Sequence, residues 1–368
     1  MADLDALVTA LNETTRAASS DQFEGLLREM ATRGASDLLL VAGVPATYRV
    51  ARRFQPAGGV LDSAEIEALV LPGIPEHARR QWSAVQIADC SLKVAGVGMF
   101  RVNLHRERGR AAATIRLLPT RIPSLQDLRL PDGVELLTKL GPGLVLIGGA
   151  TGSGKSTTLA ALIDVLNRGG HRHIITIEDP IEYEHQHHAS VIEQIEIGLD
   201  APDFATALRA AVRQAPDVIV VGEMRDPETM RSALAAAETG HLVFSTLHTT
   251  DVAATVGRIA DSFPSERQAT IRQELAMALS AVFTQSLVRA QDGTRVPACE
   301  LLVVGYGARQ HIRKNALHHL HQEITITRKQ GSFTLEEHLQ KLVTGGVIDQ
   351  REAVLRAAHP EELERLLA

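Results

Sequence analysis

Residues 149–157, GATGSGKST, have the residue types and the spacing of a loop that holds phosphate groups. Glycine and other small residues let backbone N–H groups curl around phosphate oxygens, and the N-terminus of a following helix adds partial positive charge. Lys155 is placed to reach the outer phosphates, and the Ser156 hydroxyl is placed to ligate Mg²⁺. The apolar run GLVLIGG before the loop and the helical pattern after it give the strand–loop–helix context that this motif requires.

A complete loop of this kind predicts an enzyme that uses ATP and Mg²⁺. The residues expected to bind the nucleotide are Gly149, Thr151, Gly152, Ser153, Gly154, Lys155, Ser156 and Thr157. Ser156 is also an expected metal ligand. The helix after the loop is expected to end at Gly169-Gly170, a common C-terminal helix signal.

Two glutamates further along the chain follow apolar segments. Glu223 ends the strand-like run DVIVVGE, and Glu178 ends ITIE just before Asp179-Pro180. A nucleotide hydrolase needs a base or a water-orienting group near the γ-phosphate, and a carboxylate at a strand end can also hold the metal through water. We expect both glutamates to be catalytic, with Glu223 also acting on Mg²⁺ through water and Glu178 as the candidate base.

Histidines suggest one further catalytic group. His248 follows the strand-like segment HLVFSTL, at the end where a side chain can sense phosphate, whereas His241 at its start is as readily a structural histidine. Three histidine clusters, at residues 171–173, 185–188 and 318–321, have no accompanying cysteine and no defined ligand pattern, so no metal site is expected there.

The segment FRVNLHRERGRAAATIRLLP, residues 100–119, reads as two strands joined by a two-residue turn at Arg108-Gly109. In that register Arg101 lies directly opposite Arg116 on the same face of the sheet. Like charges directly opposite each other repel, so we expect an anionic partner near the two arginines.

The pattern of the chain divides it into two domains. Residues 1–118 read as a small α+β domain that begins with a helical stretch over residues 1–32. Residues 119–133 contain three prolines within PTRIPSLQDLRLPDG and are expected to be a linker. Residues 134–368 alternate apolar strands with helices, which predicts a parallel sheet buried on both faces. After about Ser265 the chain is expected to be mostly helical, with a weak strand at CELLVVG.

Composition narrows the class of protein. The formal net charge of –6 gives no global electrostatic case for nucleic acid as a partner. The two cysteines, Cys90 and Cys299, match neither a disulfide framework nor a four-thiolate zinc site, which fits a reducing cytoplasm. The N-terminus lacks the pattern of a secretory signal, and no apolar stretch is long enough to span a membrane, so neither is expected.

Four segments occur in the order found in the secretion ATPases of type IV pili and type II secretion. They are the phosphate loop, ITIEDPIEYEH, VGEMRDPET and AETGHLVFSTLHT, and they resemble the Walker A, Asp box, Walker B and His box of that family. The resemblance runs from about Gly34 to Ile348, and the boxes are most similar to those of the pilus retraction ATPases. It implies a PAS-like N-terminal α+β domain, a RecA-like C-terminal P-loop ATPase domain and a homohexameric ring.

The resemblance also implies ATP-driven domain rotation coupled to an inner-membrane pilus platform protein, and a cytoplasmic location, peripheral to that membrane. In this family, arginines of the N-terminal hairpin reach the nucleotide held by the C-terminal domain. Arg101 and Arg116 match those positions, so both are expected to be catalytic, and a phosphate would relieve their mutual repulsion.

Three departures concern the retraction role more than ATP hydrolysis. Leu39 stands where the family has histidine, and Ile195 stands where it has arginine. The stretch GARQHIRK keeps only part of a retraction signature. The alternatives are an assembly or type II secretion ATPase, an accessory paralogue beside a main motor, a nucleic-acid translocase and a nucleotide-gated scaffold. The acidic charge argues against the translocase, and the two intact glutamates argue against the scaffold.

Overall fold

The computed structural model describes residues 20–368, so the helical prediction for residues 1–19 lies outside the described residues. The chain forms two compact units. The first ends at Arg121 and also takes in Pro180–Glu184, and the second holds Ile122–Asp179 and His185–Ala368. The domain limits expected at residues 118 and 133 stay a prediction.

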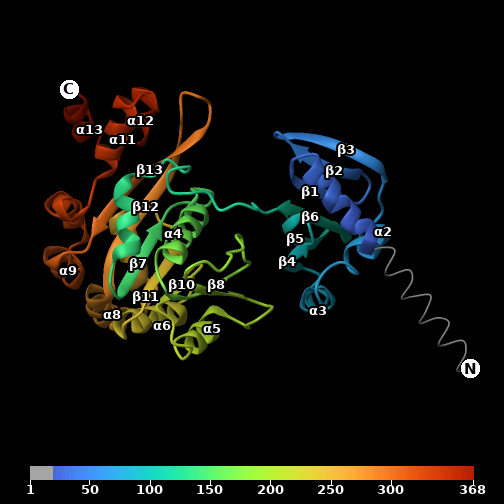
Figure 1. Cartoon of the computed structure of the whole chain (residues 1–368), viewed down its shortest axis with the longest axis horizontal. Coiled ribbons are helices and arrows are strands. Elements are labelled where there is room, and N and C mark those ends of the chain that lie inside the picture. The colour runs from blue at the N-terminus through green and yellow to red at the C-terminus, as the bar shows by residue number, and fades with distance from the viewer. Residues whose placement is uncertain (1–19) are drawn as a thin grey trace, which may run out of the picture. The chain divides into compact units, whose positions relative to one another are not determined.

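The first unit contains a six-stranded antiparallel sheet with the strand order β3-β2-β1-β6-β5-β4 (Figure 1). Its strands are β1 (Ala35–Val41), β2 (Pro45–Val50), β3 (Arg53–Val60), β4 (Ala88–Val94), β5 (Gly98–Glu107) and β6 (Arg110–Leu117). Its helices are a helix over residues 20–32, α2 (Ser63–Val70) and α3 (Glu76–Val85). This is the α+β unit that the sequence predicts, although strands β3 and β4 were not expected.

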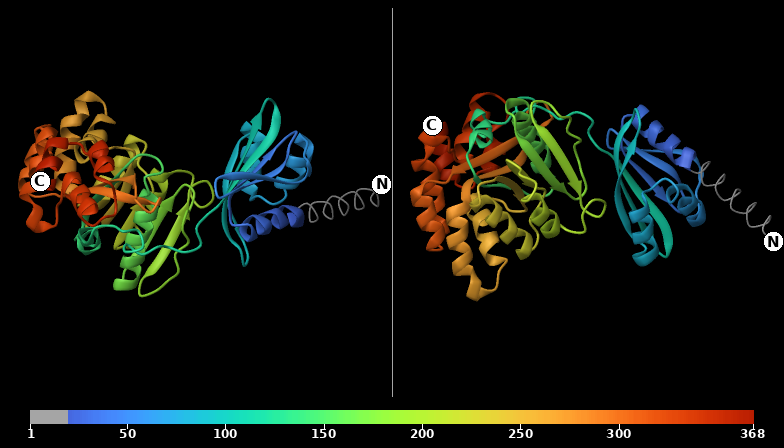
Figure 2. Two further views of the ribbon diagram at one scale, coloured as in Figure 1. Left: turned by 90° about the horizontal axis from the view of Figure 1, so that it is seen from above. Right: turned by 60° about the horizontal axis from the view of Figure 1, so that its bottom comes forward.

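One face of this sheet is apolar and the other is polar. Alternate residues of β5, such as Phe100 and Val102, are buried, and they form one core with Leu38 of β1 and Trp82 of α3. Figure 2 shows this sheet and its helices from two further directions. Successive strand residues point to opposite faces, so the residues between them, including Arg101, lie on the polar face. Pro180–Glu184 joins this unit, and there Lys93 Nζ lies 2.5 Å from a Glu184 carboxylate oxygen.

The second unit contains a seven-stranded sheet with the order β13-β12-β7-β11-β10-β8-β9. Its strands are β7 (Gly143–Gly148), β8 (His173–Glu178), β9 (Val191–Glu196), β10 (Val218–Val221), β11 (Leu242–Leu247), β12 (Leu279–Arg289) and β13 (Arg295–Val303). All neighbouring pairs are parallel except β12 and β13. This is the RecA-like P-loop sheet expected from the sequence.

Helices cover both faces of this sheet (Figure 1). They are α4 (Lys155–Gly169), α5 (Phe204–Ala211), α6 (Pro227–Glu238), α7 (Val252–Asp261), α8 (Ser265–Ala278), α9 (Tyr306–Arg313), α10 (Leu320–Ile326), α11 (Leu335–Thr344), α12 (Gln350–Arg356) and α13 (Pro360–Leu367). Three short 3₁₀ helices are η1 (Asp132–Lys139), η2 (Leu317–His319) and η3 (Arg328–Gln330). Val145 and Ile147 of β7 pack with α4, whereas Leu144 and Leu146 pack with α5–α8. This alternation explains why the strands read as continuous apolar runs.

The region after Ser265 is mostly helical, as expected, and the expected strand at CELLVVG lies largely within β13. Strand β12 was not expected, although it pairs antiparallel with β13 over residues 279–303. The apolar run LSAVFTQSLV of β12 is as compatible with a buried helix as with a strand, because periodicity alone does not separate them. Within the described residues, no helix is both long enough and apolar enough to cross a bilayer.

Candidate functional site

The candidate site lies where four neighbouring parallel strands of the second unit end. In sheet order these strands are β7, β11, β10 and β8, and their C-terminal ends reach the same edge. Gly148 of β7 pairs with Leu247 of β11, and Val221 of β10 pairs with Ser245 and Ile177 on its two sides. The side chains that follow these ends are therefore brought together by the sheet, at the place where α/β proteins bind ligands.

The phosphate loop follows β7 and has a backbone that only glycine supports at two crowded positions. Gly149 has a φ of 156°, and a Cβ there would lie 2.4 Å from Ser153 Oγ and 2.5 Å from the Gln285 carbonyl oxygen. Gly154 has a φ of 93°, and a Cβ would lie 2.9 Å from the Gln285 side-chain nitrogen. The loop can therefore keep this tight curl only with glycine at both positions.

Helix α4 begins directly after this loop at Lys155. No side chain caps its N-terminus, since the N-cap residue is Gly154. The first N–H groups of a helix have no partner within the helix, so this end is suited to an anion. Lys155 is only 7% exposed, and its Nζ donates to the carbonyl oxygens of Gly149, at 2.7 Å, and Ala150, at 3.0 Å. The ammonium group of Lys155 is thus held beside the curled backbone of the loop.

Gln285 of β12 holds the phosphate loop through hydrogen bonds and was not predicted from the sequence. Its Nε2 donates to the Ser153 carbonyl oxygen at 2.7 Å, and its Oε1 accepts from the Thr158 hydroxyl at 2.7 Å. The side chain is buried, so each of its ends is satisfied by the loop or by α4. The only signal in the sequence was one amide within an apolar run.

His248 connects the phosphate loop to Glu223. Its Nδ1 lies 3.3 Å from the Thr151 hydroxyl of the loop, and its Nε2 lies 3.4 Å from a carboxylate oxygen of Glu223. The Glu223 side chain is 15% exposed and also pairs with Arg225. The sequence placed these groups at strand ends, and the structure shows that Thr151, His248 and Glu223 are in direct contact.

Glu178 lies at the end of β8, next to β10 in the sheet. One of its carboxylate oxygens accepts from the Thr176 hydroxyl at 2.6 Å and from the Gln194 amide at 3.0 Å. Two neutral donors on one oxygen fix the orientation of the carboxylate. His241, in contrast, lies 2.9 Å from the Ala236 carbonyl oxygen through its Nδ1, which is the structural role considered for it.

Arg101 and Arg116 belong to the first unit and form the pair expected from the hairpin. They are direct cross-strand partners on β5 and β6, and the turn residues Arg108 and Gly109 have φ values of 50° and 76°, so the predicted register and turn are confirmed. Their approach to a nucleotide held by the second unit remains a prediction.

Each of these arginines has a carboxylate partner that the sequence did not reveal. Arg101 lies 2.7 Å from Asp89 of β4, and Arg116 lies 2.9 Å from Asp37 of β1. Asp37 is also 3.6 Å from Arg49 of β2, its cross-strand neighbour on the other side. The repulsion between the two arginines is therefore already offset within the sheet.

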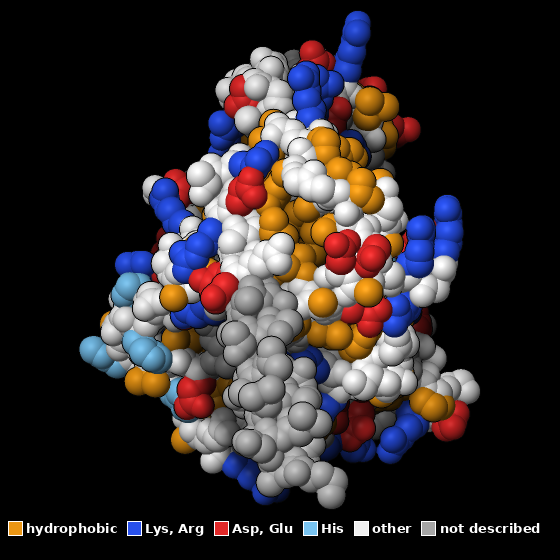
Figure 3. Space-filling view, turned by 90° about the vertical axis from the view of Figure 1, so that its right-hand side faces the viewer, with side chains coloured by type: hydrophobic (Ala, Val, Ile, Leu, Met, Phe, Trp, Pro, Cys, Tyr) orange, Lys and Arg blue, Asp and Glu red, His pale blue; other side chains and the backbone are white. Residues whose placement is uncertain are grey.

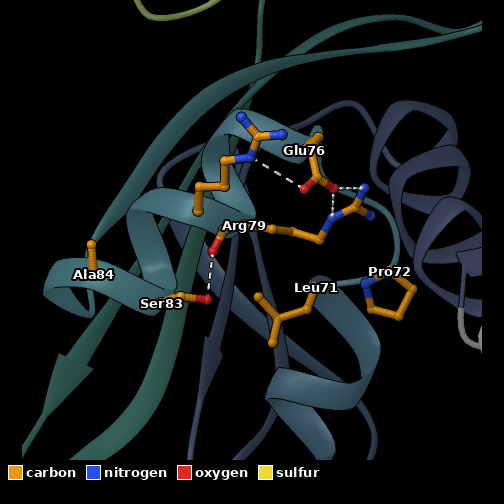
Figure 4. A pocket seen from close by; sticks show the side chains of 7 residues that line it. Leu71, Pro72, Glu76, Arg79, Ser83 and Ala84 are labelled. Carbon is orange, nitrogen blue, oxygen red and sulfur yellow. Dashed lines mark hydrogen bonds and ion pairs between the residues drawn. The ribbon is translucent and has the colours of Figure 1, made fainter.

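A hollow of about 670 Å³ lies elsewhere in the first unit, beside α2 and α3 (Figure 4). Its charged lining groups are paired with one another, because Glu76 bonds to Arg79 at 2.8 Å and to Arg80 at 3.3 Å. None of the expected site residues lines it. The candidate site is therefore the strand-end edge and not this hollow.

The face of the molecule in Figure 3 shows basic and acidic side chains interspersed among polar and apolar ones. A protein that binds the phosphate backbone of a nucleic acid usually presents a basic patch or stripe on its surface. The pattern on this face gives no support to the nucleic-acid translocase alternative.

The expected Mg²⁺ ligands have the chemistry that this ion prefers. The Ser156 hydroxyl is exposed in the first turn of α4, and the Glu223 carboxylate lies at the neighbouring strand end. Both are hard oxygen donors, and Mg²⁺ is usually held by few protein ligands together with phosphate oxygens and water. The residues present therefore fit the metal.

Comparisons with known proteins identify the family to which the chain belongs. Residues 115–360 match the model of a family described as type II/IV secretion system protein. The chain is 40% identical over 339 residues to the type IV pilus retraction ATPase PilT of Pseudomonas aeruginosa, covering 91% of this chain and 98% of that protein. It is 38% identical over 348 residues to the type IV pilus ATPase PilU of the same species, covering 94% and 91%.

A solved structure supports the fold over nearly the whole chain. The crystal structure of the pilus retraction motor PilT with bound ADP superposes with a TM-score of 0.84 and 41% sequence identity. The match covers 93% of this chain and 98% of that one. The fold of this chain, with its α+β first unit and RecA-like second unit, is thus shared with a protein that binds ADP.

Proposed function

Because the chain belongs to the type II/IV secretion system family and is an ATPase of the kind found in type IV pilus machines, we propose that it powers pilus retraction. The observation that carries the ATPase part of this proposal is the contact of His248 with both the phosphate loop and Glu223, and the retraction part rests on the similarity to PilT. That contact joins the loop that would hold the phosphates to the carboxylate that would act on Mg²⁺ through water, two parts that phosphoryl-transfer enzymes use.

We infer that hydrolysis is divided among the strand ends of the second unit. The phosphate loop and Lys155 hold the outer phosphates, and the curl fixed by Gln285 keeps their donors in place. Glu178 orients or deprotonates the attacking water, and its fixed carboxylate suits that task. His248 senses the phosphate through Thr151 and passes a change of position to Glu223.

The metal and the arginines complete the site in this proposal. Ser156 and Glu223 would hold Mg²⁺, Glu223 through water, and the ion would offset charge on the outer phosphates. Arg101 and Arg116 would approach those phosphates when the two units close, and a guanidinium fork can bridge two phosphate oxygens. They would then add charge that the phosphate loop does not supply.

The assembly that would turn hydrolysis into movement is also proposed. A homohexameric ring would place several such sites around one axis, and rotation between the units would drive an inner-membrane pilus platform protein. The location that follows is cytoplasmic and peripheral to the inner membrane. The resemblance to retraction ATPases over nearly the whole chain supports this arrangement.

The test is deletion of the gene in the organism that encodes it, followed by counts of surface pili and assays of surface motility. Retraction predicts excess pili without motility, restored by the wild-type gene but not by Lys155→Ala. Loss of pili would contradict retraction and identify an assembly ATPase.

Three residue differences favour a second candidate, an accessory ATPase that works beside a main retraction motor. Leu39, Ile195 and the GARQHIRK stretch at α9 depart from the retraction pattern. This candidate predicts that deletion of the gene alone leaves pilus number normal and reduces motility without abolishing it. A complete loss of motility would exclude it.

A further inference from the structure

Three side chains that are far apart in the sequence meet among the C-terminal helices of the second unit. They are His321 of α10, Glu336 of α11 and Glu362 of α13. One ligand atom from each lies within 4.8 Å of the other two. The sequence of residues 318–321 predicts no metal site, because the two carboxylates become neighbours of His321 only in the fold.

Glu336 forms the buried base of this cluster. The residue is 0% exposed, and its Oε1 accepts from the His359 backbone N–H at 2.8 Å. Its other oxygen, Oε2, is buried and has no hydrogen-bond partner among the described residues. A buried carboxylate with an unsatisfied oxygen is costly, and a cation bound there would remove much of that cost.

The other two side chains lead from this base to the solvent. His321 Nε2 lies 2.9 Å from Glu362 Oε2, and these side chains are 28% and 29% exposed. A hydrated ion can therefore reach the cluster from outside, and water can complete its coordination. The ring of His359 also packs near that of His321, with ring centroids 4.1 Å apart.

The donor set selects a class of metal. One imidazole nitrogen and two carboxylates suit first-row ions such as Zn²⁺, whereas Mg²⁺ and Ca²⁺ prefer ligands that are all oxygen. We propose that His321, Glu336 and Glu362 form a binding site for a first-row divalent cation, best represented by Zn²⁺. This site lies outside the nucleotide site and does not depend on the proposed retraction function.

The consequence of binding would be a cross-link between three helices. Helix α13 has eight residues, and a single one of them, Leu363, is buried. It packs with α11 in a small apolar core beside β12 and β13. An ion that ties α13 to α10 and α11 would stabilise the native state by mass action, because the ligands are not preorganised in the unfolded chain.

The experiment is a Zn²⁺ titration of the full chain after treatment with a chelator and without nucleotide, followed by calorimetry and thermal melting. We expect one tight equivalent per chain and a rise in melting temperature. Glu362→Gln and His321→Gln should each weaken that equivalent at least about tenfold. The matched controls Glu361→Gln and His318→Gln alter exposed neighbours and should bind as the wild type does.

Glu336→Gln separates a metal ligand from a structural residue. Glutamine keeps an oxygen for the His359 N–H and removes the buried charge, so the metal-free variant should melt no lower than the wild type. Zn²⁺ should nevertheless fail to raise the melting temperature of this variant. Mg²⁺ should cause no comparable rise in melting temperature in any variant. Unchanged Zn²⁺ binding in Glu336→Gln and Glu362→Gln would overturn the proposal, as would absence of the tight equivalent in the wild type.

Discussion

The two groups of candidate catalytic residues are held by their sheets in opposite ways. In the second unit, the candidate residues follow strand ends along one edge of a parallel sheet, with Lys155 at the start of α4 and Glu178, Glu223 and His248 at or just after strand ends. In the first unit, Arg101 and Arg116 stand within strands, on the polar face of an antiparallel sheet. In the second unit, the order of the parallel strands brings the side chains at their ends together. In the first unit, the pairing register of two strands places the two arginines opposite each other.

The difference extends to charge. Lys155 donates to carbonyl oxygens of its own loop and lies at the uncapped N-terminus of α4, where an anion is favoured. Arg101 and Arg116 are each paired with an aspartate, and a phosphate would have to compete with that partner. We therefore expect the second unit to determine nucleotide binding, and the arginines to matter mainly when charge develops in the transition state.

The largest effect is expected for Lys155→Ala. The outer phosphates lose their cation, so ATP turnover should be abolished. The measurement is steady-state phosphate release, with Lys139→Ala as the control, because that lysine is 66% exposed and pairs only with Glu135 among the described ion pairs. Turnover near that of the wild type in Lys155→Ala would show that the site has been wrongly assigned.

A smaller but still large effect is expected for Glu223→Gln and Glu178→Gln. Each should keep ATP binding and lose turnover by roughly a hundredfold or more, the scale of a positioned acid–base group. Nucleotide affinity and turnover are measured together, and Glu193→Gln, on the exposed side of β9, is the control. Weak binding instead of slow turnover in Glu178→Gln would make that residue a metal or nucleotide ligand.

Gln285→Ala should have an intermediate effect. The variant loses both hydrogen bonds that brace the phosphate loop and leaves the Thr158 hydroxyl without its acceptor. Each such loss costs about 1–3 kcal/mol, so nucleotide affinity should fall about tenfold or more. Ser286→Ala alters the exposed neighbour and should leave affinity unchanged. Equal affinity in the two variants would show that the loop keeps its curl without the brace.

The smallest effect is a pH-dependent loss of stability that is expected in the second unit and not in the first. Burial lowers the pKa of His185 from 6.5 to about 4, so the folded second unit keeps it neutral. The unfolded chain takes up this proton below about pH 6.5, and stability is therefore lost as the pH falls from 6.5 towards 4. Between pH 7 and pH 5 the wild type should lose about 2 kcal/mol more than His185→Gln does.

Hydrogen exchange at β8 and β10 reports this loss in the second unit. The single tryptophan, Trp82, lies in the first unit, so its fluorescence during unfolding is an internal control. A difference between the wild type and His185→Gln that is independent of pH would contradict the prediction.

The features that the sequence predicted are those set by short stretches of chain. The phosphate loop is contiguous, the strand ends of a parallel sheet meet wherever apolar runs alternate with helices, and a two-residue turn sets the register of Arg101 and Arg116. The features that were missed depend on distant segments. Gln285 reaches the loop only because β12 is a strand next to β7, and Asp37 meets Arg116 only because β1 pairs with β6.

Variants of the two arginines of the first unit test most directly whether the two units have different roles in catalysis. Turnover, nucleotide affinity and unfolding followed by Trp82 fluorescence are measured for Arg101→Ala, Arg116→Ala and the two corresponding lysine variants. Arg49→Ala is the matched control, because Arg49 lies in the same cross-strand row and also pairs with Asp37. We predict that each alanine variant lowers turnover at least about tenfold while affinity changes little, and that lysine rescues poorly. Full turnover in both alanine variants, or a loss of turnover matched by a large fall in stability, would contradict the account.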